Sequence, residues 1–312
     1  MDKDSKIYLS GHHGLVGSAI LGRLSAAGYR NIVTRTHAEL DLTRQDQTEA
    51  FFESEKPEYV FLSAAKVGGI GANSHYPAQF IYQNLEIALN IINSSYKTGV
   101  KKLLNLGSSC IYPKFAPQPM KEEHLLSGAL EPTNEAYAIA KIAAIKLCKH
   151  YNDEYGTNYI SVMPTNMYGP GDRYDLENGH VLPTLIRKFH EAKVRGGEVT
   201  LWGDGSALRE FLYSDDLGAA CVFLMEKFDY RDLGEFVNIG SGEELTIKKL
   251  AALVADIVGY TGKVHWDSSK PNGTPRKLLD SSRLFALGWR PEVGLRTGIE
   301  KAYRDFLERE GL

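Results

Sequence analysis

Residues 7–17 read IYLSGHHGLVG, which predicts a buried strand, a glycine-rich turn and the start of a helix. Apolar side chains then recur at helical spacing until Gly28, where the helix should end; they are Leu15, Val16, Ala19, Ile20 and Leu24. Glycines in such a turn let the backbone approach a pyrophosphate, and the helix N-terminus offers free N–H groups. We therefore expect a dinucleotide to contact Gly11, His12, His13, Gly14, Leu15, Val16 and Gly17. The spacing GxxGxxG leaves an ordinary glycine-rich turn as the alternative.

Short apolar runs, separated by helical patterns, recur through the first half of the chain. The runs are Ile7–Ser10, Asn31–Thr34, Tyr59–Leu62, Lys102–Leu106 and Ile160–Met163. Continuous apolar strands between helices are typical of a parallel sheet that is covered on both faces. We therefore predict an α/β fold, a Rossmann-type doubly wound parallel sheet with a smaller C-terminal substrate-binding lobe.

The pattern changes after Pro164, where loops become longer and richer in Gly, Pro and Asp. We assign residues 1–168 to the dinucleotide-binding Rossmann domain and residues 169–312 mainly to the substrate-binding lobe. An apolar run at Phe236–Ile239 and a helical pattern over residues 246–258 occur in this second part. We therefore expect some of its segments to return to the Rossmann sheet.

The composition excludes several classes of protein. The chain has 312 residues, 43% of them hydrophobic, so a packed core forms easily and global disorder is excluded. A net charge of -3 argues against a surface devoted to nucleic acid, and no run of 18 apolar residues predicts a membrane span. Three cysteines make no disulfide framework, and the charged N-terminus resembles no signal peptide, so we expect a cytoplasmic protein.

The residues that follow the second predicted strand bear on the type of dinucleotide. An NAD site usually places an acidic side chain there, on the ribose 2′-hydroxyl. This chain has Arg35 instead, and a guanidinium suits a 2′-phosphate, so we favour NADP(H). A solvated surface arginine is the alternative. Asp41 lies a few residues further on and could reach the adenine edge.

Three residues form a candidate catalytic group. Ser108 follows the fourth predicted strand, where ligands of open α/β sheets bind. Tyr137 and Lys141 stand four residues apart in a helical pattern and so share one face. A lysine ammonium beside a phenol favours the phenolate, so we expect Lys141 to lower the pKa of Tyr137 toward the working pH. Tyr137 and Ser108 would then hold a carbonyl oxygen while NADPH delivers hydride to carbon. A surface lysine near a half-buried tyrosine is the alternative.

Taken together, these motifs in this order resemble the extended short-chain dehydrogenase/reductases, which act on nucleotide sugars. Closer motifs are similar to those of the GDP-L-fucose synthase family. They are AAKVGGI at Ala64–Ile70, GSSCIYP at Gly107–Pro113, EPTNE at Glu131–Glu135, PTNMYG at Pro164–Gly169 and GHVLP at Gly179–Pro183. The chain departs from the family pattern at Ala136, where many members have proline, and at Arg173-Tyr174, where many have Asn-Phe.

The resemblance implies 3,5-epimerisation and 4-keto reduction of GDP-4-keto-6-deoxy-D-mannose to GDP-L-fucose with NADPH. It also implies that Cys110 is the base and His180 the acid of epimerisation. The chemistry is coherent, because one C4 ketone acidifies the protons on both C3 and C5. Ser108, Cys110, Tyr137, Lys141 and His180 are therefore the expected catalytic residues. The further cofactor contacts that it implies are Leu106, Gly107, Ser108, Ser109, Lys141, Pro164, Thr165, Asn166, Met167 and His180.

By the same resemblance, Lys188, Trp202, Arg209 and Asp280 contact the nucleotide sugar. Asp280 ends the segment Pro275–Asp280, in which a basic residue and an aspartate border the nucleotide. The family is commonly a homodimer through two long helices, here residues 77–97 and 134–155. The histidines show no metal-ligand spacing, and we expect no metal. Two alternatives stay open: a 4,6-dehydratase or 4-epimerase with tightly bound NAD, and a non-enzymatic NADPH-binding module.

Overall fold

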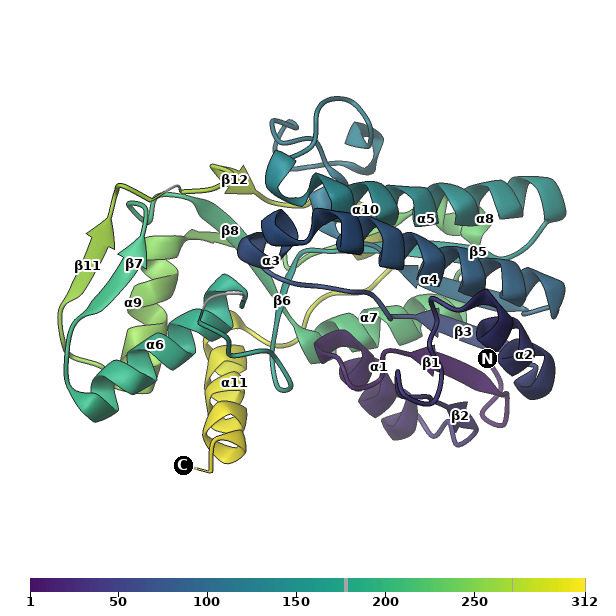
Figure 1. Ribbon diagram of the computed structural model, residues 1–312, viewed down its shortest axis with the longest axis horizontal. Coiled ribbons are helices and arrows are strands. Elements are labelled where there is room, and N and C mark those ends of the chain that lie inside the picture. The colour runs from purple at the N-terminus through teal and green to yellow at the C-terminus, as the bar shows by residue number, and fades with distance from the viewer. Residues whose placement is uncertain (177–178, 271, 312) are drawn as a thin grey trace.

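The computed structural model of the chain describes residues 1–176, 179–270 and 272–311. Figure 1 shows a larger lobe, which is built on a parallel sheet, beside a smaller lobe of helices and short strands. The two termini lie in different lobes, the N-terminus beside the sheet and the C-terminus at the end of α11 (Leu295–Arg309). None of the helices in the described residues is both long and apolar enough to cross a membrane.

The larger sheet has six parallel strands in the order β2-β1-β3-β4-β5-β9. They are β1 (Ile7–Ser10), β2 (Ile32–Val33), β3 (Tyr59–Leu62), β4 (Lys102–Leu106), β5 (Tyr159–Pro164) and β9 (Val237–Ile239). The chain runs from β1 to β2 on one side and then crosses to β3 on the other. This reversal of direction creates the crevice in which open α/β sheets bind their ligands. The predicted Rossmann-type fold class is confirmed.

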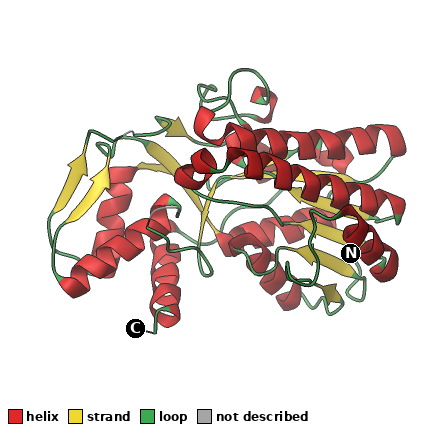
Figure 2. Ribbon diagram, viewed as in Figure 1, coloured by secondary structure: helices red, strands yellow, loops and turns green. Residues whose placement is uncertain are grey.

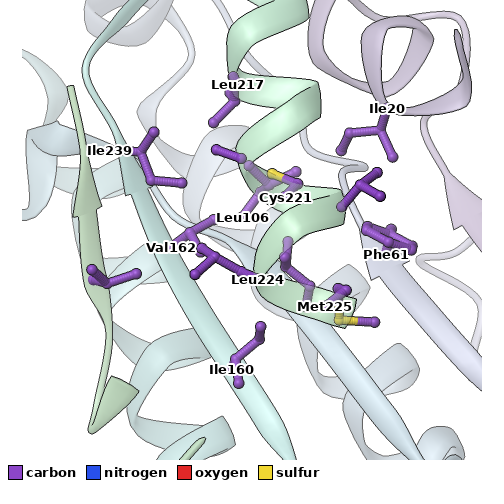
Figure 3. Packing of buried hydrophobic residues seen from close by; sticks show 14 of the residues in the cluster. Ile20, Phe61, Leu106, Ile160, Val162, Leu217, Cys221, Leu224, Met225 and Ile239 are labelled. Atoms are coloured by element: carbon purple, nitrogen blue, oxygen red, sulfur yellow. The ribbon is translucent and has the colours of Figure 1, made fainter. Parts of the chain in front are cut away.

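Helices cover both faces of this sheet, as the red and yellow elements in Figure 2 show. On one face α1 (Leu15–Ala26) packs against α7 (Ser214–Lys227). The other face carries α2 (Gln45–Glu55), α4 (Pro77–Lys97) and α5 (Glu135–Tyr155), and α4 and α5 lie side by side. Figure 3 shows α7 side chains such as Leu217 and Leu224 packed toward Val162 of β5 and Ile20 of α1. Burial of these apolar side chains explains why the helices lie against the sheet.

The smaller lobe has its own hydrophobic core between helices and short strands. Its helices are α6 (Val181–Arg195), α9 (Ile247–Val258) and α11. Its strands are β6 (Asn166–Tyr168), β7 (Val199–Trp202), β8 (Leu208–Tyr213), β10 (Glu244–Thr246), β11 (Val264–Asp267) and β12 (Arg276–Lys277). The remaining short helices of the chain are α3 (Ile70–His75), α8 (Tyr230–Leu233) and α10 (Ser282–Ala286).

Segments from the second half of the chain return to the larger lobe, as the sequence predicts. β9 forms the sixth strand beside β5, and α7 covers one face of the sheet. The carboxylate of the fully buried Glu210 of β8 accepts hydrogen bonds from Gly242 N (2.8 Å), which follows β9, and from Leu279 N (3.1 Å), which follows β12. The division at residues 168 and 169 stays a prediction.

Candidate active site

Two glycines of the turn after β1 are packed too closely to accept a side chain. A Cβ on Gly17 would lie 2.0 Å from the Gly11 carbonyl oxygen, and one on Gly11 would lie 3.0 Å from the backbone of Ala64. Gly11 also has a φ of 74°, which favours glycine. Gly14 precedes α1, and no side chain caps that helix. The helix thus begins without a side-chain cap at the place where the sequence predicts a pyrophosphate contact, and that contact stays a prediction.

The side chains after β2 lie at the expected adenosine end of the crevice. Arg35 forms an ion pair with Glu55 of α2 at 2.6 Å and donates a hydrogen bond to the Thr34 carbonyl at 2.8 Å. Its guanidinium also lies 5.4 Å from the centre of the Phe51 ring. The carboxylate of Asp41 accepts hydrogen bonds from the Thr43 N–H and hydroxyl, at 3.0 and 2.7 Å. A 2′-phosphate would therefore share Arg35 with Glu55.

The catalytic loop begins where β4 ends. A Cβ on Gly107 would lie 2.0 Å from the Met163 side chain, so the loop passes β5 at close range. Ser108 then caps the short 3-10 turn Ser109–Ile111, and its hydroxyl accepts a hydrogen bond from Cys110 N at 3.4 Å. The Ser108 hydroxyl also lies near enough to the Tyr137 phenol to lower its pKa. The structure thus brings Ser108, Cys110 and Tyr137 together.

Tyr137 and Lys141 share one face of α5, as their spacing predicts. The Lys141 amine lies 5.8 Å from the centre of the Tyr137 ring and donates a hydrogen bond of 2.7 Å to the Leu106 carbonyl. Lys141 is buried, and burial lowers its pKa from 10.5 to about 8. Burial raises the pKa of Tyr137, and the neighbouring Cys110 raises it further. The expected lowering of the Tyr137 pKa is therefore wrong for this structure, because desolvation of the phenolate outweighs the other influences.

Cys110 is buried beside this group. Burial raises the pKa of its thiol, whereas the charges of Lys277 and Lys141 and a hydrogen bond from Ser108 lower it. His180 stands immediately before α6 and keeps access to solvent. The surrounding protein lowers the pKa of His180, and the charge of Lys277 lowers it further. The charge of Lys277 therefore lowers the pKa of both Cys110 and His180.

Lys277 was not singled out by the sequence. It lies on β12, which pairs with β8 so that Lys277 stands opposite Arg209. The only sequence signal was its place in the Pro275–Asp280 segment. Two-residue strands such as β12 leave no periodic pattern, so the direction of this side chain could not be read from the sequence.

The residues expected to follow β5 along the cofactor join the two lobes. Pro164 ends β5, and Met167 lies in β6, which pairs with β8. Thr165 is buried and its N–H donates to the Ile239 carbonyl at 3.0 Å. The Asn166 side chain donates to the Glu210 carbonyl at 2.8 Å. These contacts hold the stretch at the carboxyl end of the sheet.

The four expected substrate residues are spread over the smaller lobe. Arg209 on β8 lies beside Lys277, and burial lowers its pKa. Lys188 on α6 donates to the Thr200 carbonyl at 3.2 Å, and Trp202 at the end of β7 is 64% exposed. Asp280 accepts a hydrogen bond from Ser282 N at the start of α10 (3.0 Å). Within the described residues, no hydrogen bond or ion pair joins these four side chains to the catalytic group.

The same described ranges hold no group of three His, Cys, Asp or Glu side chains arranged for a metal ion. They do place two cations, Lys277 and Arg209, opposite each other on β12 and β8, and the charge of Lys277 acts on the thiol of Cys110 and the imidazole of His180. Such a set can hold an anionic ligand, polarise a carbonyl oxygen and move protons at neighbouring carbons.

Comparisons with known proteins identify the family of the chain. Residues 7–240 match the NAD dependent epimerase/dehydratase family. The chain is 60% identical to GDP-L-fucose synthase 1 of Arabidopsis thaliana, over 98% of this chain and 94% of that protein. It is 50% identical to GDP-L-fucose synthase of Escherichia coli strain K12, over 98% of this chain and 97% of that protein.

A solved structure of a GDP-L-fucose synthetase from Naegleria fowleri bound to NADP is also similar. It has a TM-score of 0.91 and 29% identity, and the match covers 100% of this chain and 96% of that one. The resemblance expected from the sequence motifs is thus confirmed. The chain belongs to the NAD dependent epimerase/dehydratase family and, within it, to the GDP-L-fucose synthase family.

Proposed function

We propose that this protein converts GDP-4-keto-6-deoxy-D-mannose to GDP-L-fucose by 3,5-epimerisation followed by 4-keto reduction with NADPH. The observation that supports this most directly is the meeting of Ser108, Tyr137 and Lys141 with the thiol of Cys110. A plain ketone reductase needs the first three residues. A thiol beside them adds a base that can act on carbon next to the same ketone.

Reduction uses a protonated Tyr137. Because burial raises the pKa of this phenol, it keeps its proton at neutral pH and can donate it to the C4 oxygen. Ser108 donates a second hydrogen bond to the same oxygen as negative charge develops there. Lys141, anchored to the Leu106 carbonyl, keeps a positive charge beside the phenol. NADPH, when bound, supplies the hydride to C4.

Epimerisation uses the same oxygen site. Cys110 as thiolate removes the proton from C3 or C5, and the C–H electron pair moves into the enolate, whose oxygen is held by Tyr137 and Ser108. His180 as imidazolium then returns a proton to that carbon from the opposite face. The sulfur ends protonated and the imidazole neutral, so both exchange protons with solvent before the second carbon inverts.

The site residues fit NADP(H). Gly11 and Gly17 have room only for backbone, and α1 has an uncapped N-terminus that can bind the pyrophosphate. Arg35 provides a cation for the 2′-phosphate, where an NAD site would have an acidic residue. The similar Naegleria fowleri protein was solved with NADP bound.

We also propose a homodimer through α4 and α5. These adjacent helices expose large apolar side chains that a monomer would leave in water; they are Tyr82, Leu89, Tyr96, Ile139 and Tyr155.

The three cysteines are free and buried, which fits a reducing compartment, and we propose the cytoplasm.

The test is incubation of the purified protein with NADPH and GDP-4-keto-6-deoxy-D-mannose, with the product identified by NMR. The expected product is GDP-L-fucose, with one NADPH consumed per sugar. A product reduced at C4 but unchanged at C3 and C5 would leave only a ketone reductase. Tightly bound NAD, with no consumption of NADPH, would favour the dehydratase or 4-epimerase alternative.

A further inference from the structure

The side chain of Glu210 on β8 joins its own strand to two other segments of the chain. It is fully buried, and each carboxylate oxygen accepts a different hydrogen bond, Oε1 from Gly242 N at 2.8 Å and Oε2 from Leu279 N at 3.1 Å. Gly242 lies in the turn between β9 and β10, and Leu279 follows β12. One carboxylate therefore ties the edge of the large sheet to the segment after β12.

The two hydrogen bonds require a carboxylate. Both donors are backbone N–H groups, and a carboxylate accepts at either oxygen, whereas a glutamine amide accepts at one end and donates at the other. A glycine leaves the space for this group, because a Cβ on Gly240 would lie 2.3 Å from Oε1 of Glu210. Burial raises the pKa of Glu210, and the hydrogen bonds from Gly242 and Leu279 lower it. The surroundings of Glu210 thus fit a carboxylate and not an amide.

The segment after β12 is held from two sides. Met120 bonds to one side of it: its N–H donates to the Leu278 carbonyl and its carbonyl accepts from Asp280 N, both at 2.8 Å. Leu279 stands between these two bonds, and successive N–H groups of an extended chain point in opposite directions. Leu279 N therefore points away from Met120, and Glu210 accepts its hydrogen bond on that other side.

The carboxylate and the backbone carbonyl of Glu210 contact different parts of the site. The carboxylate holds the segment that begins with Lys277, which stands opposite Arg209, and ends with Asp280. Arg209 and Asp280 are expected contacts of the nucleotide sugar. The backbone carbonyl accepts a hydrogen bond of 2.8 Å from the Asn166 side chain, which belongs to the stretch expected along the cofactor. A change in the carboxylate alone therefore leaves the bond to the cofactor stretch in place.

We propose that Glu210 is a positioning residue for the nucleotide sugar, whose carboxylate holds residues 277–280 where Asp280 and Arg209 can contact the same GDP group. This inference rests on the proposed function, because that function places a GDP-sugar at these two residues. Glu210 itself touches no ligand and exchanges no proton. Loss of its carboxylate releases Leu279 N from its anchor and loosens the nucleotide end of the site, while the contact of Asn166 with the carbonyl remains.

The experiment measures the binding of GDP and of NADPH separately, by isothermal titration calorimetry on the purified chain. In E210Q the amide NH₂ would face one of the two N–H donors, so the Kd of GDP should rise at least about tenfold and that of NADPH should change less than about twofold. G240A, which displaces the carboxylate without removing it, should give the same pattern. E243Q is the matched control, because Glu243 is exposed in the same turn as Gly242, and it should bind both ligands as the wild type does.

Two outcomes would overturn the proposal. One is wild-type affinity for GDP in folded E210Q and G240A. The other is an equal loss of affinity for GDP and NADPH, which would make Glu210 a support of the whole site and not of the nucleotide end. Circular dichroism checks folding, and G240A provides the test if E210Q does not fold.

Neither titration involves turnover. A wild type that binds GDP and NADPH but forms no GDP-L-fucose would therefore refute the proposed function, and the GDP affinities of the variants would still decide the role of Glu210.

Discussion

Replacing Lys141 by methionine should raise the free energy of unfolding of the cofactor-free protein near neutral pH. The same substitution should abolish most of the enzyme activity. The lysine is buried, and its pKa falls from 10.5 to about 8 on folding. At about 1.4 kcal/mol per whole pKa step, keeping this charge inside the protein costs about 3 kcal/mol. Methionine removes that cost but also the 2.7 Å hydrogen bond to the Leu106 carbonyl, which is worth about 2 kcal/mol. K141M should therefore gain about 1 kcal/mol at pH near 7.

The pH dependence of this difference identifies its cause. Because the folded pKa of Lys141 is lowered, the unfolded chain binds more protons between about pH 8 and 10.5. The wild type therefore recovers stability relative to K141M as the pH rises through that window, and the advantage of the variant reverses. Titration of buried tyrosines outside the catalytic group, such as Tyr29 and Tyr168, affects both proteins equally and cancels in the comparison.

Urea unfolding of the two proteins without NADPH, followed by circular dichroism at several pH values, measures this difference. K146M is the matched control on the same helix, because Lys146 forms a surface ion pair with Glu235 and its loss should change stability by less than about 1 kcal/mol. A difference between K141M and wild type that does not vary between about pH 7 and 9.5 would refute the reasoning. Turnover of K141M should fall by at least about a hundredfold.

Four further outcomes are expected. Gly17→Ala should weaken NADPH binding at least about tenfold in a fluorescence titration, because its Cβ would lie 2.0 Å from the Gly11 carbonyl; unchanged affinity would remove this turn from the cofactor site. Arg35→Ala should lower the preference for NADPH over NADH at least about tenfold in kcat/KM, and an unchanged ratio would assign Arg35 to its ion pair with Glu55 alone. Cys110→Ala should stop deuterium uptake from solvent at C3 and C5, as NMR would show, and wild-type exchange would exclude it as the base. Leu89→Glu should convert a dimer to a monomer in size-exclusion chromatography with light scattering, and an unchanged mass would place the interface elsewhere.

Most of the larger lobe could be predicted from the sequence because its strands are continuous apolar runs. β3 and β4 have the predicted bounds, and α5 begins one residue after the predicted start. β2 is shorter than predicted and spans only Ile32–Val33; directly after it, the Arg35 guanidinium donates a hydrogen bond to the Thr34 carbonyl. A local pattern of apolar residues is enough to predict a strand or helix that is buried along its whole length.

The smaller lobe could be predicted only in outline. Its strands have two to six residues, and their partners lie far away in the chain. The position of Lys277 opposite Arg209 depends on the pairing of β12 with β8, which leaves no local pattern. The pKa of Tyr137 was likewise misjudged, because spacing to Lys141 is visible in the sequence and burial of the phenol is not.

The late arrival of β9 has a consequence for how the polypeptide is made on the ribosome. Until α7 leaves the exit tunnel, one apolar face of the sheet stays uncovered, and until Val237–Ile239 then follows, β5 has an unpaired edge. Open edges of this kind invite pairing with other nascent chains. The Rossmann lobe therefore completes its folding only after most of the protein has been synthesised, and chaperones that bind exposed apolar surface have their main opportunity before that moment.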